Sequence, residues 1–312
     1  MKSDLRTALE EYLATRRALG FELRKAGHAL HHFVSFMEQE GAAFITRDLA
    51  LRWAKQPAKA DPGWWWERLG FVRRFAQCQS ATDSRTEIPP PGLLPRRYRR
   101  KPPYVYSDGE IAQILLAARS LRSPRGLRAH AYSTLFGLMA ATGMRTREAA
   151  ALRRDDVDWA ERLLVVRKTK FQKSRLAPLH PSSCERMLQY ARRRDRCHPE
   201  PKTDRFFVSD DGRRLGAKTV QRTFRRITRK IGLSAPAGGR EPRLHDLRHR
   251  FAVKTLAHWY RSGMDVERHI RDLATYLGHT HVADTYWYLT DNPELLSLAA
   301  MLLGRPAGGA SS

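Results

Sequence analysis

Apolar residues recur every three or four positions through the first 80 residues, which is the spacing of one buried face of an α-helix. The series at 5–13 and 30–37 predict two helices, and two more are predicted at 47–56 and 63–79. This segment contains no pattern typical of a strand. We therefore expect a four-helix unit at the start of the chain.

The segment that follows, residues 81–103, is rich in proline and poor in apolar side chains, which is typical of a linker. It also carries a block of basic residues at 96–101. We therefore expect three parts in the chain: a helical N-terminal domain at 1–85, a basic, proline-rich linker at 86–103, and a second domain at 104–312.

The second domain opens with Ser107 and Glu110, which have the spacing of a helix capping box. Two short β-like runs, 163–166 and 176–179, flank a polar stretch and predict a hairpin, and Pro178 restricts its second arm to a sheet edge. Helical spacing returns at about 108–119, 128–142, 182–196, 217–231, 244–260, 266–277 and 293–303, with a short helix after the turn at 142–143. The expected fold is mainly α with a small antiparallel β-sheet.

Charge changes this picture by indicating a partner. Lysine and arginine number 57 against 32 aspartate and glutamate, a net charge of +25, while 42% of the residues are hydrophobic. The hydrophobic content excludes a wholly disordered basic tail, and the charge predicts a polyanion, most commonly nucleic acid. The sequence has no membrane-spanning run, no signal-peptide core and three cysteines without a C-x-x-C pair. We expect a cytoplasmic protein without a membrane partner.

Four short segments place charged, histidine or tyrosine side chains at spacings that suit catalysis. In chain order they are Arg145 with Glu148, the lysine-rich hairpin tip at 168–173, His245 with Arg248, and His279 with Tyr288 nine residues later. Taken alone, each is ordinary: an exposed ion pair, surface lysines, a solvated basic helix, and a histidine and tyrosine of the surface or core. Their order along one chain is what points to a common site.

This order and these local spacings resemble the tyrosine recombinase, or lambda-integrase-like, family of site-specific DNA recombinases. The resemblance is specific at 142–148, 244–248 and 277–288, and in outline it extends to the helical N-terminal domain, which in that family binds the core DNA site. It implies a catalytic set of Arg145, Lys170, His245, Arg248, His279 and the nucleophile Tyr288, with Glu148 supporting Arg145. Lys168 and Lys173 remain alternatives for the hairpin lysine, and Tyr286 for the nucleophile.

The chemistry of these residue types suits cleavage of a phosphodiester. Arg145 and Arg248 present charged forks to the non-bridging oxygens, and His279 adds a hydrogen bond. His245 is the candidate base for Tyr288, and a hairpin lysine protonates the leaving 5′-oxygen. The product that the resemblance implies is a 3′-phosphotyrosyl bond, which would conserve energy for rejoining without ATP. The sequence has no phosphate-binding P-loop and no carboxylate cluster for Mg²⁺, so we expect no cofactor and no metal.

Double-stranded DNA is the partner that this assignment requires. Basic residues expected to contact it are Arg99, Arg100, Arg222, Arg225, Arg226 and Arg229. The nearly uncharged tail predicts an apolar helix at about 292–304, which packs either on its own core or, as the resemblance implies, on a neighbouring subunit of a tetramer formed on DNA. A type IB topoisomerase-like enzyme and a non-catalytic DNA-binding protein are the alternatives to an integrase or transposition enzyme.

Overall fold

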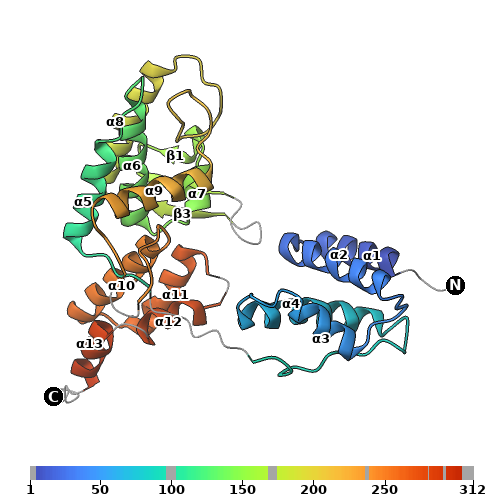
Figure 1. Cartoon of the computed structure of the whole chain (residues 1–312). Helices are drawn as coiled ribbons and strands as arrows, with labels where there is room; N and C mark the ends of the chain where they lie inside the picture. The colour runs from blue at the N-terminus through green and yellow to red at the C-terminus, as the bar shows by residue number, and fades with distance from the viewer. Residues whose placement is uncertain are drawn as a thin grey trace. The chain divides into compact units, whose positions relative to one another are not determined.

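A computed structural model describes residues 5–95, 103–167, 174–235, 239–279, 281–290 and 293–303. The chain divides into two compact units, residues 1–100 and 101–312 (Figure 1). The division lies inside the segment that the sequence marks as a linker.

The first unit is a bundle of four helices, as predicted: α1 Leu5–Ala18, α2 Arg24–Gln39, α3 Arg47–Lys55 and α4 Pro62–Gln79. Its described residues contain no strand. The Thr46 side chain caps α3 by accepting a hydrogen bond from the backbone of Leu49, and Asp61 caps α4. The apolar faces meet in a core that includes Leu9, Phe33, Trp53 and Phe75, all at most 1% exposed.

Part of the proline-rich segment packs on this first unit. Leu94 is buried in the core of the bundle. The Arg73 guanidinium donates to the carbonyls of Pro89 and Pro90, and the Glu87 backbone N–H donates to the carbonyl of Ile45. Residues up to 95 therefore belong to the folded unit, because their carbonyls and one apolar side chain find partners there. Arg99 and Arg100 lie outside the described residues.

The second unit is mainly helical, as predicted (Figure 1). Its helices are α5 Asp108–Arg119, α6 Leu127–Thr142, α7 Thr146–Ala151, α8 Pro181–Cys197, α9 Ala217–Lys230, α10 Asp246–Arg261, α11 Val266–Leu277, α12 Ala283–Thr290 and α13 Pro293–Leu303, with a 3₁₀ turn at Arg154–Asp156. Ser107 and Glu110 form the expected capping box at α5. The sequence pattern did not predict α12, whose Tyr-Trp-Tyr run has poor helix formers and no clear cap.

The small sheet has three antiparallel strands in the order β1-β2-β3. They are β1 Val157–Asp158, β2 Leu163–Val166 and β3 Arg175–Pro178. Pro178 pairs with Leu163 on the edge strand β3, where its missing N–H leaves no central ladder position unfilled. The hairpin of β2 and β3 is therefore confirmed, whereas β1 is too short to show an alternating pattern. The hairpin tip, with Lys168, Lys170 and Lys173, lies outside the described residues.

Two apolar clusters hold the second unit together. The first joins α5, α6, α8, α9 and the sheet and includes Phe136, Phe207 and Phe224. The second joins α10 to α13 and includes Leu277 and Tyr288. The C-terminal end of α6 and the β3 strand meet α10 and α11 at the junction between them, where the predicted catalytic residues gather.

The described residues bear on three expectations from the sequence, which concern the cysteines, membrane-spanning helices and metal-binding clusters. Cys78, Cys184 and Cys197 are all free thiols. Within the described ranges, no helix is long and apolar enough to cross a membrane. The described residues also hold no cluster of three or more histidine, cysteine or carboxylate side chains that could bind a metal ion. A cytoplasmic location and metal-free chemistry stay predictions.

Candidate active site

Arg145 stands at the N-terminus of α7, directly after the turn that ends α6. Gly143 forms that turn with a φ of 61°, and a Cβ atom there would lie 2.7 Å from Cδ1 of Phe251. Only glycine combines this backbone with such close packing. Glu148, in the first turn of α7, accepts hydrogen bonds from the Arg145 backbone N–H at 2.9 Å and from its Nη1 at 2.8 Å. The predicted ion pair is therefore formed, and it also caps the helix.

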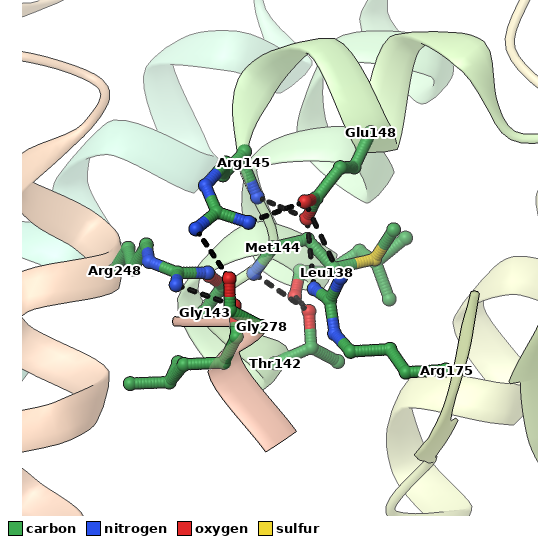
Figure 2. A network of polar contacts seen from close by, with 10 residues as sticks. Leu138, Thr142, Gly143, Met144, Arg145, Glu148, Arg175, Arg248 and Gly278 are labelled. Atoms are coloured by element: carbon green, nitrogen blue, oxygen red, sulfur yellow. Dashed lines mark hydrogen bonds and ion pairs between the residues drawn. The ribbon is translucent and has the colours of Figure 1, made fainter. Parts of the chain in front are cut away.

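Glu148 has a second arginine partner that sequence reasoning did not assign to the site. Arg175, the first residue of β3, donates from Nη2 to Oε2 of Glu148 at 2.8 Å and from Nη1 to Oε1 at 3.3 Å. Burial opposes ionisation of Glu148, but the hydrogen bonds and charge of Arg175, together with those of Arg145, outweigh it and lower the pKa of Glu148. The carboxylate is thus ionised between two guanidinium groups (Figure 2).

Arg248, in the first turn of α10, is the most buried cation of the site, with 2% of its surface exposed. Its Nη1 donates to the Gly143 carbonyl at 2.9 Å (Figure 2). Its Nη2 donates to the Leu277 carbonyl at 2.5 Å. Burial first, and repulsion by Arg145 second, lower the pKa of Arg248 to about 10. Because this pKa is still well above 7, Arg248 is charged at neutral pH. The two carbonyls that accept from it lie at the negative C-terminal ends of α6 and α11, which suits a cation.

The C-terminal end of α11 also holds Arg145. The Nη2 of Arg145 donates to the Gly278 carbonyl at 2.9 Å. Gly278 ends α11 directly after the predicted helix range 266–277, with a φ of 67°, and a Cβ atom there would lie 3.4 Å from Nη1 of Arg145 and 3.3 Å from Nη1 of Arg175. Glycine therefore serves twice here, since it permits the left-handed turn and lets the guanidinium groups approach the backbone.

The two predicted histidines lie beside these arginines. His279 is partly buried, and its Nδ1 lies 2.7 Å from Oγ1 of the fully buried Thr285. Burial first, and then the charges of Arg248 and Arg145, lower the pKa of His279 to about 4. His245 immediately precedes α10 and keeps an exposed surface, yet desolvation by surrounding protein and repulsion by Arg248 lower its pKa as well. Repulsion by the positive charges of Arg248 and Arg145 would by itself lower the pKa of each histidine, so both rings favour the neutral form.

The low pKa of His279 predicts a loss of stability on mild acidification. The unfolded chain binds a proton at this residue below its ordinary pKa of about 6.5, whereas the folded protein resists protonation down to about pH 4. The free energy of unfolding should therefore fall as the pH drops through this window. Urea unfolding at pH 7 and pH 5 should show a smaller decrease for His279→Gln than for the wild type. Equal decreases in both proteins would contradict the assignment.

Tyr288 and Tyr286 lie on α12 in different environments. Tyr288 is 6% exposed, and its ring centroid lies 5.9 Å from that of His279 and 4.9 Å from that of His249. An ionised Tyr288 would favour the charged form of Arg248, so the two groups interact electrostatically. Tyr286 is 41% exposed. Sequence reasoning also missed His249, a residue of α10 whose ring packs against Trp287 and Tyr288 of α12.

The structure brings most of the predicted set together. Backbone and side-chain contacts connect Arg145, Glu148, Arg248, His279 and Tyr288 through the ends of α6 and α11, and His245 begins the helix that carries Arg248. The predicted DNA-contacting residues of α9, Arg222, Arg225, Arg226 and Arg229, are exposed, opposite its buried face. They make no described contact with the catalytic set. Lys170 falls outside the described residues.

A mainly helical domain with a small antiparallel sheet is the fold of the tyrosine recombinases, which are site-specific DNA recombinases. The chain belongs to the phage integrase family, whose sequence profile matches residues 106–294. That range contains every predicted catalytic residue. The fold class and the family resemblance inferred from the sequence are therefore confirmed.

Relatives and solved structures agree with this family. The chain is 45% identical to a Sinorhizobium fredii (strain NBRC 101917 / NGR234) protein named as an integrase/recombinase, y4rB, over 97% of this chain and 98% of that one. It is 31% identical to the tyrosine recombinase XerC of Chlamydia caviae over 57% of this chain and 52% of that protein. A lambda integrase tetramer bound to a Holliday junction shares the fold, with a TM-score of 0.57, 16% identity, and coverage of 89% and 77%.

Proposed function

We propose that this recombinase cleaves and rejoins DNA through a 3′-phosphotyrosyl intermediate on Tyr288, without ATP or metal. The observation that carries the proposal is the way in which Arg145 and Arg248 are held. The Arg248 guanidinium donates to the carbonyls of Gly143 and Leu277, and the Arg145 guanidinium donates to the carbonyl of Gly278, so backbone groups hold both side chains in place. Preorganised cations of this kind stabilise the charge that develops on a phosphate in the transition state.

Each arginine keeps donors for a substrate. A guanidinium has five N–H groups, and among the described residues the Arg248 side chain uses two of them, on the two helix-end carbonyls. The Arg145 side chain likewise uses two, on Glu148 and Gly278. The remaining N–H groups can form paired hydrogen bonds to the non-bridging oxygens of the scissile phosphate.

The neutral histidines supply a donor and an acceptor. We assign the Thr285 hydroxyl as the donor to Nδ1 of His279, which places the ring proton on Nε2, where it can donate to the phosphate. His245, held neutral beside Arg248, can accept the proton of Tyr288 as the phenol oxygen attacks phosphorus. The P–O bond to the 5′-oxygen breaks, and that oxygen takes its proton from the hairpin lysine, for which Lys170 stays the prediction.

A covalent-adduct assay tests the proposal. A cognate duplex is first selected from a random-sequence pool by binding to the Tyr288→Phe protein, and nicked versions are prepared so that cleavage releases a short fragment and traps the product. The wild-type protein should form an adduct that resists denaturation, in the presence of EDTA and without ATP. An adduct that requires a divalent metal or ATP would contradict the mechanism. A non-catalytic DNA-binding protein would form no adduct at all.

The basic face of α9 is the surface that we propose to contact the DNA backbone. Val220, Phe224 and Ile227 bury its other face, so the arginines are directed to solvent. The affinity for DNA falls as salt rises, and the double variant Arg225→Gln/Arg226→Gln should make the slope of log affinity against log salt shallower by about 2. This corresponds to ~0.9 for each of the two lost phosphate contacts. Binding titrations at several salt concentrations measure this slope. An unchanged slope would remove α9 from the DNA interface.

The tail helix α13 bears on assembly. Leu295 is 1% exposed and packs with α10 and α12 residues, whereas Leu296 is 53% exposed. One side of the helix therefore packs on its own chain, and Leu296 on the other side is exposed and could contact a neighbour. We propose a protein that is monomeric when free and tetrameric on two DNA sites, like the lambda integrase complex. Sedimentation with and without DNA tests this.

Exchange of strands between two duplexes, in addition to relaxation of supercoils, separates a recombinase from a topoisomerase-like enzyme.

A further inference from the structure

We propose that Arg175 is a positioning residue for the recombination reaction, and that it fixes the orientation of Arg145 through the carboxylate of Glu148. The inference rests on the proposed function, because Arg145 is the residue assigned to the scissile phosphate. Arg175 lies at the start of β3, with a side chain 11% exposed, and the side chain of Glu148 is 7% exposed. Both groups are thus shielded from water.

The contacts explain how one arginine can orient the other. Oε1 of Glu148 accepts from Nη1 of Arg145 at 2.8 Å and from Nη1 of Arg175 at 3.3 Å. Oε2 accepts from the Arg145 backbone N–H at 2.9 Å and from Nη2 of Arg175 at 2.8 Å. Each carboxylate oxygen therefore accepts from both arginines (Figure 2). The two-point contact with Arg175 keeps the carboxylate plane from rotating, and this fixed orientation is the one in which Glu148 binds Arg145.

Charge gives a second reason. A buried carboxylate tends to take up a proton, and a neutral acid holds a guanidinium less firmly than a carboxylate does. Arg175 supplies the largest contribution that keeps Glu148 ionised despite burial. Loss of Arg175 would leave Glu148 paired with Arg145 alone. The Arg145 side chain is 28% exposed, so it is less confined by its surroundings than Glu148 or Arg175.

The chain offers a matched control for a buried arginine outside the site. Arg194 on α8 is 4% exposed and makes a two-point contact with Asp195, at 2.8 and 3.0 Å. It also donates to the carbonyl of Phe206 at 3.0 Å. Its partner Asp195 is 48% exposed, so Arg194→Gln removes a buried guanidinium with a two-point contact, but not a buried carboxylate pair, and does not touch the catalytic set.

The test compares two suicide substrates of the selected cognate site. One carries the natural phosphodiester, and the other carries a methylphosphonate at the scissile position, in which a methyl group replaces a non-bridging oxygen and removes its charge. Arg175→Gln should slow cleavage of the phosphodiester about 10- to 100-fold, by analogy with the loss of an outer residue that orients a ligand of the active site. On the neutral methylphosphonate the same variant should lie within about threefold of the wild type, because less charge awaits stabilisation. Arg175→Lys can contact the carboxylate at one point instead of two, so its cleavage rate on the phosphodiester should lie between those of the wild type and Arg175→Gln.

The outcomes separate this inference from the proposed function. If the wild type forms no adduct, the proposed function fails; if the wild type cleaves normally and Arg175→Gln cleaves equally fast, only the role of Arg175 fails. Equal losses on both substrates would show a merely structural role, as would an additive effect of Arg175→Gln in a Glu148→Gln background. Arg194→Gln should lower the thermal stability but leave cleavage by the folded protein unchanged on both substrates. Arg175→Lys provides the comparison if Arg175→Gln does not fold.

Discussion

Replacing Tyr288 with phenylalanine should abolish the covalent protein–DNA adduct and leave DNA binding nearly unchanged. The substitution removes only the phenol oxygen that we assign as the nucleophile. The ring that packs against His279 and His249 is retained, so α12 keeps its place beside α10. Cleavage of the nicked cognate duplex, followed by denaturing electrophoresis, measures the adduct, and a mobility-shift titration measures binding.

The neighbouring tyrosine is the control for this prediction. Tyr286→Phe should form the adduct at a rate within about twofold of the wild type, since its side chain is exposed and lies outside the buried set. The reverse pattern, with an adduct from the Tyr288 variant and none from the Tyr286 variant, would move the nucleophile to Tyr286. Loss of adduct in both variants would indicate that the integrity of α12, rather than one oxygen, limits cleavage.

Replacing Arg248 with alanine should have the second large effect, a fall in the cleavage rate of at least about 1000-fold. The guanidinium is the most deeply buried charge that we assign to the phosphate, and its donors are fixed by two helix ends. The variant should also lose about 1–3 kcal/mol of stability, because the carbonyls of Gly143 and Leu277 lose their buried donor. Single-turnover cleavage and urea unfolding measure the two effects separately.

Another arginine of the same helix shows whether the two effects are independent. Arg250 is also buried, but it bonds to the Tyr106 carbonyl and to Asp108, away from the catalytic set. Arg250→Ala should lower stability and leave the cleavage rate of the folded protein within a few-fold of the wild type. A comparable loss of cleavage in both variants would mean that packing of α10, rather than charge at the phosphate, explains the result for Arg248.

The sequence predicted the fold where local pattern suffices and failed where distant contacts decide. Most helices were predicted within a residue or two, because amphipathic spacing and caps such as Thr46 are local signals. The helix at Ala283–Thr290 lacks such signals, and it is stabilised by burying Thr285 and Tyr288 against neighbouring helices. Strand β1 is formed by two residues, a length at which alternation cannot be recognised.

The candidate site divides in a similar way. The order of the four segments indicated Arg145, His245, Arg248, His279 and Tyr288, because each occurs in a short local motif. Arg175 could not be identified from a local motif, because its contact with Glu148 depends on strand pairing and on the packing of the sheet near α7. The helix-end carbonyls that hold the arginines belong to backbone groups, which leave no mark in a sequence except the glycines that shape the turns.

Mass spectrometry of the adduct tests the central claim most directly. The complex formed on the nicked cognate duplex is digested with a protease and a nuclease, and the nucleotide-bearing peptide is sequenced by fragmentation. The account predicts a peptide in which Tyr288 carries the 3′-phosphate of the cleaved strand, with a free 5′-hydroxyl on the released fragment. A phosphate on another residue, or a linkage through the 5′-phosphate, would contradict it.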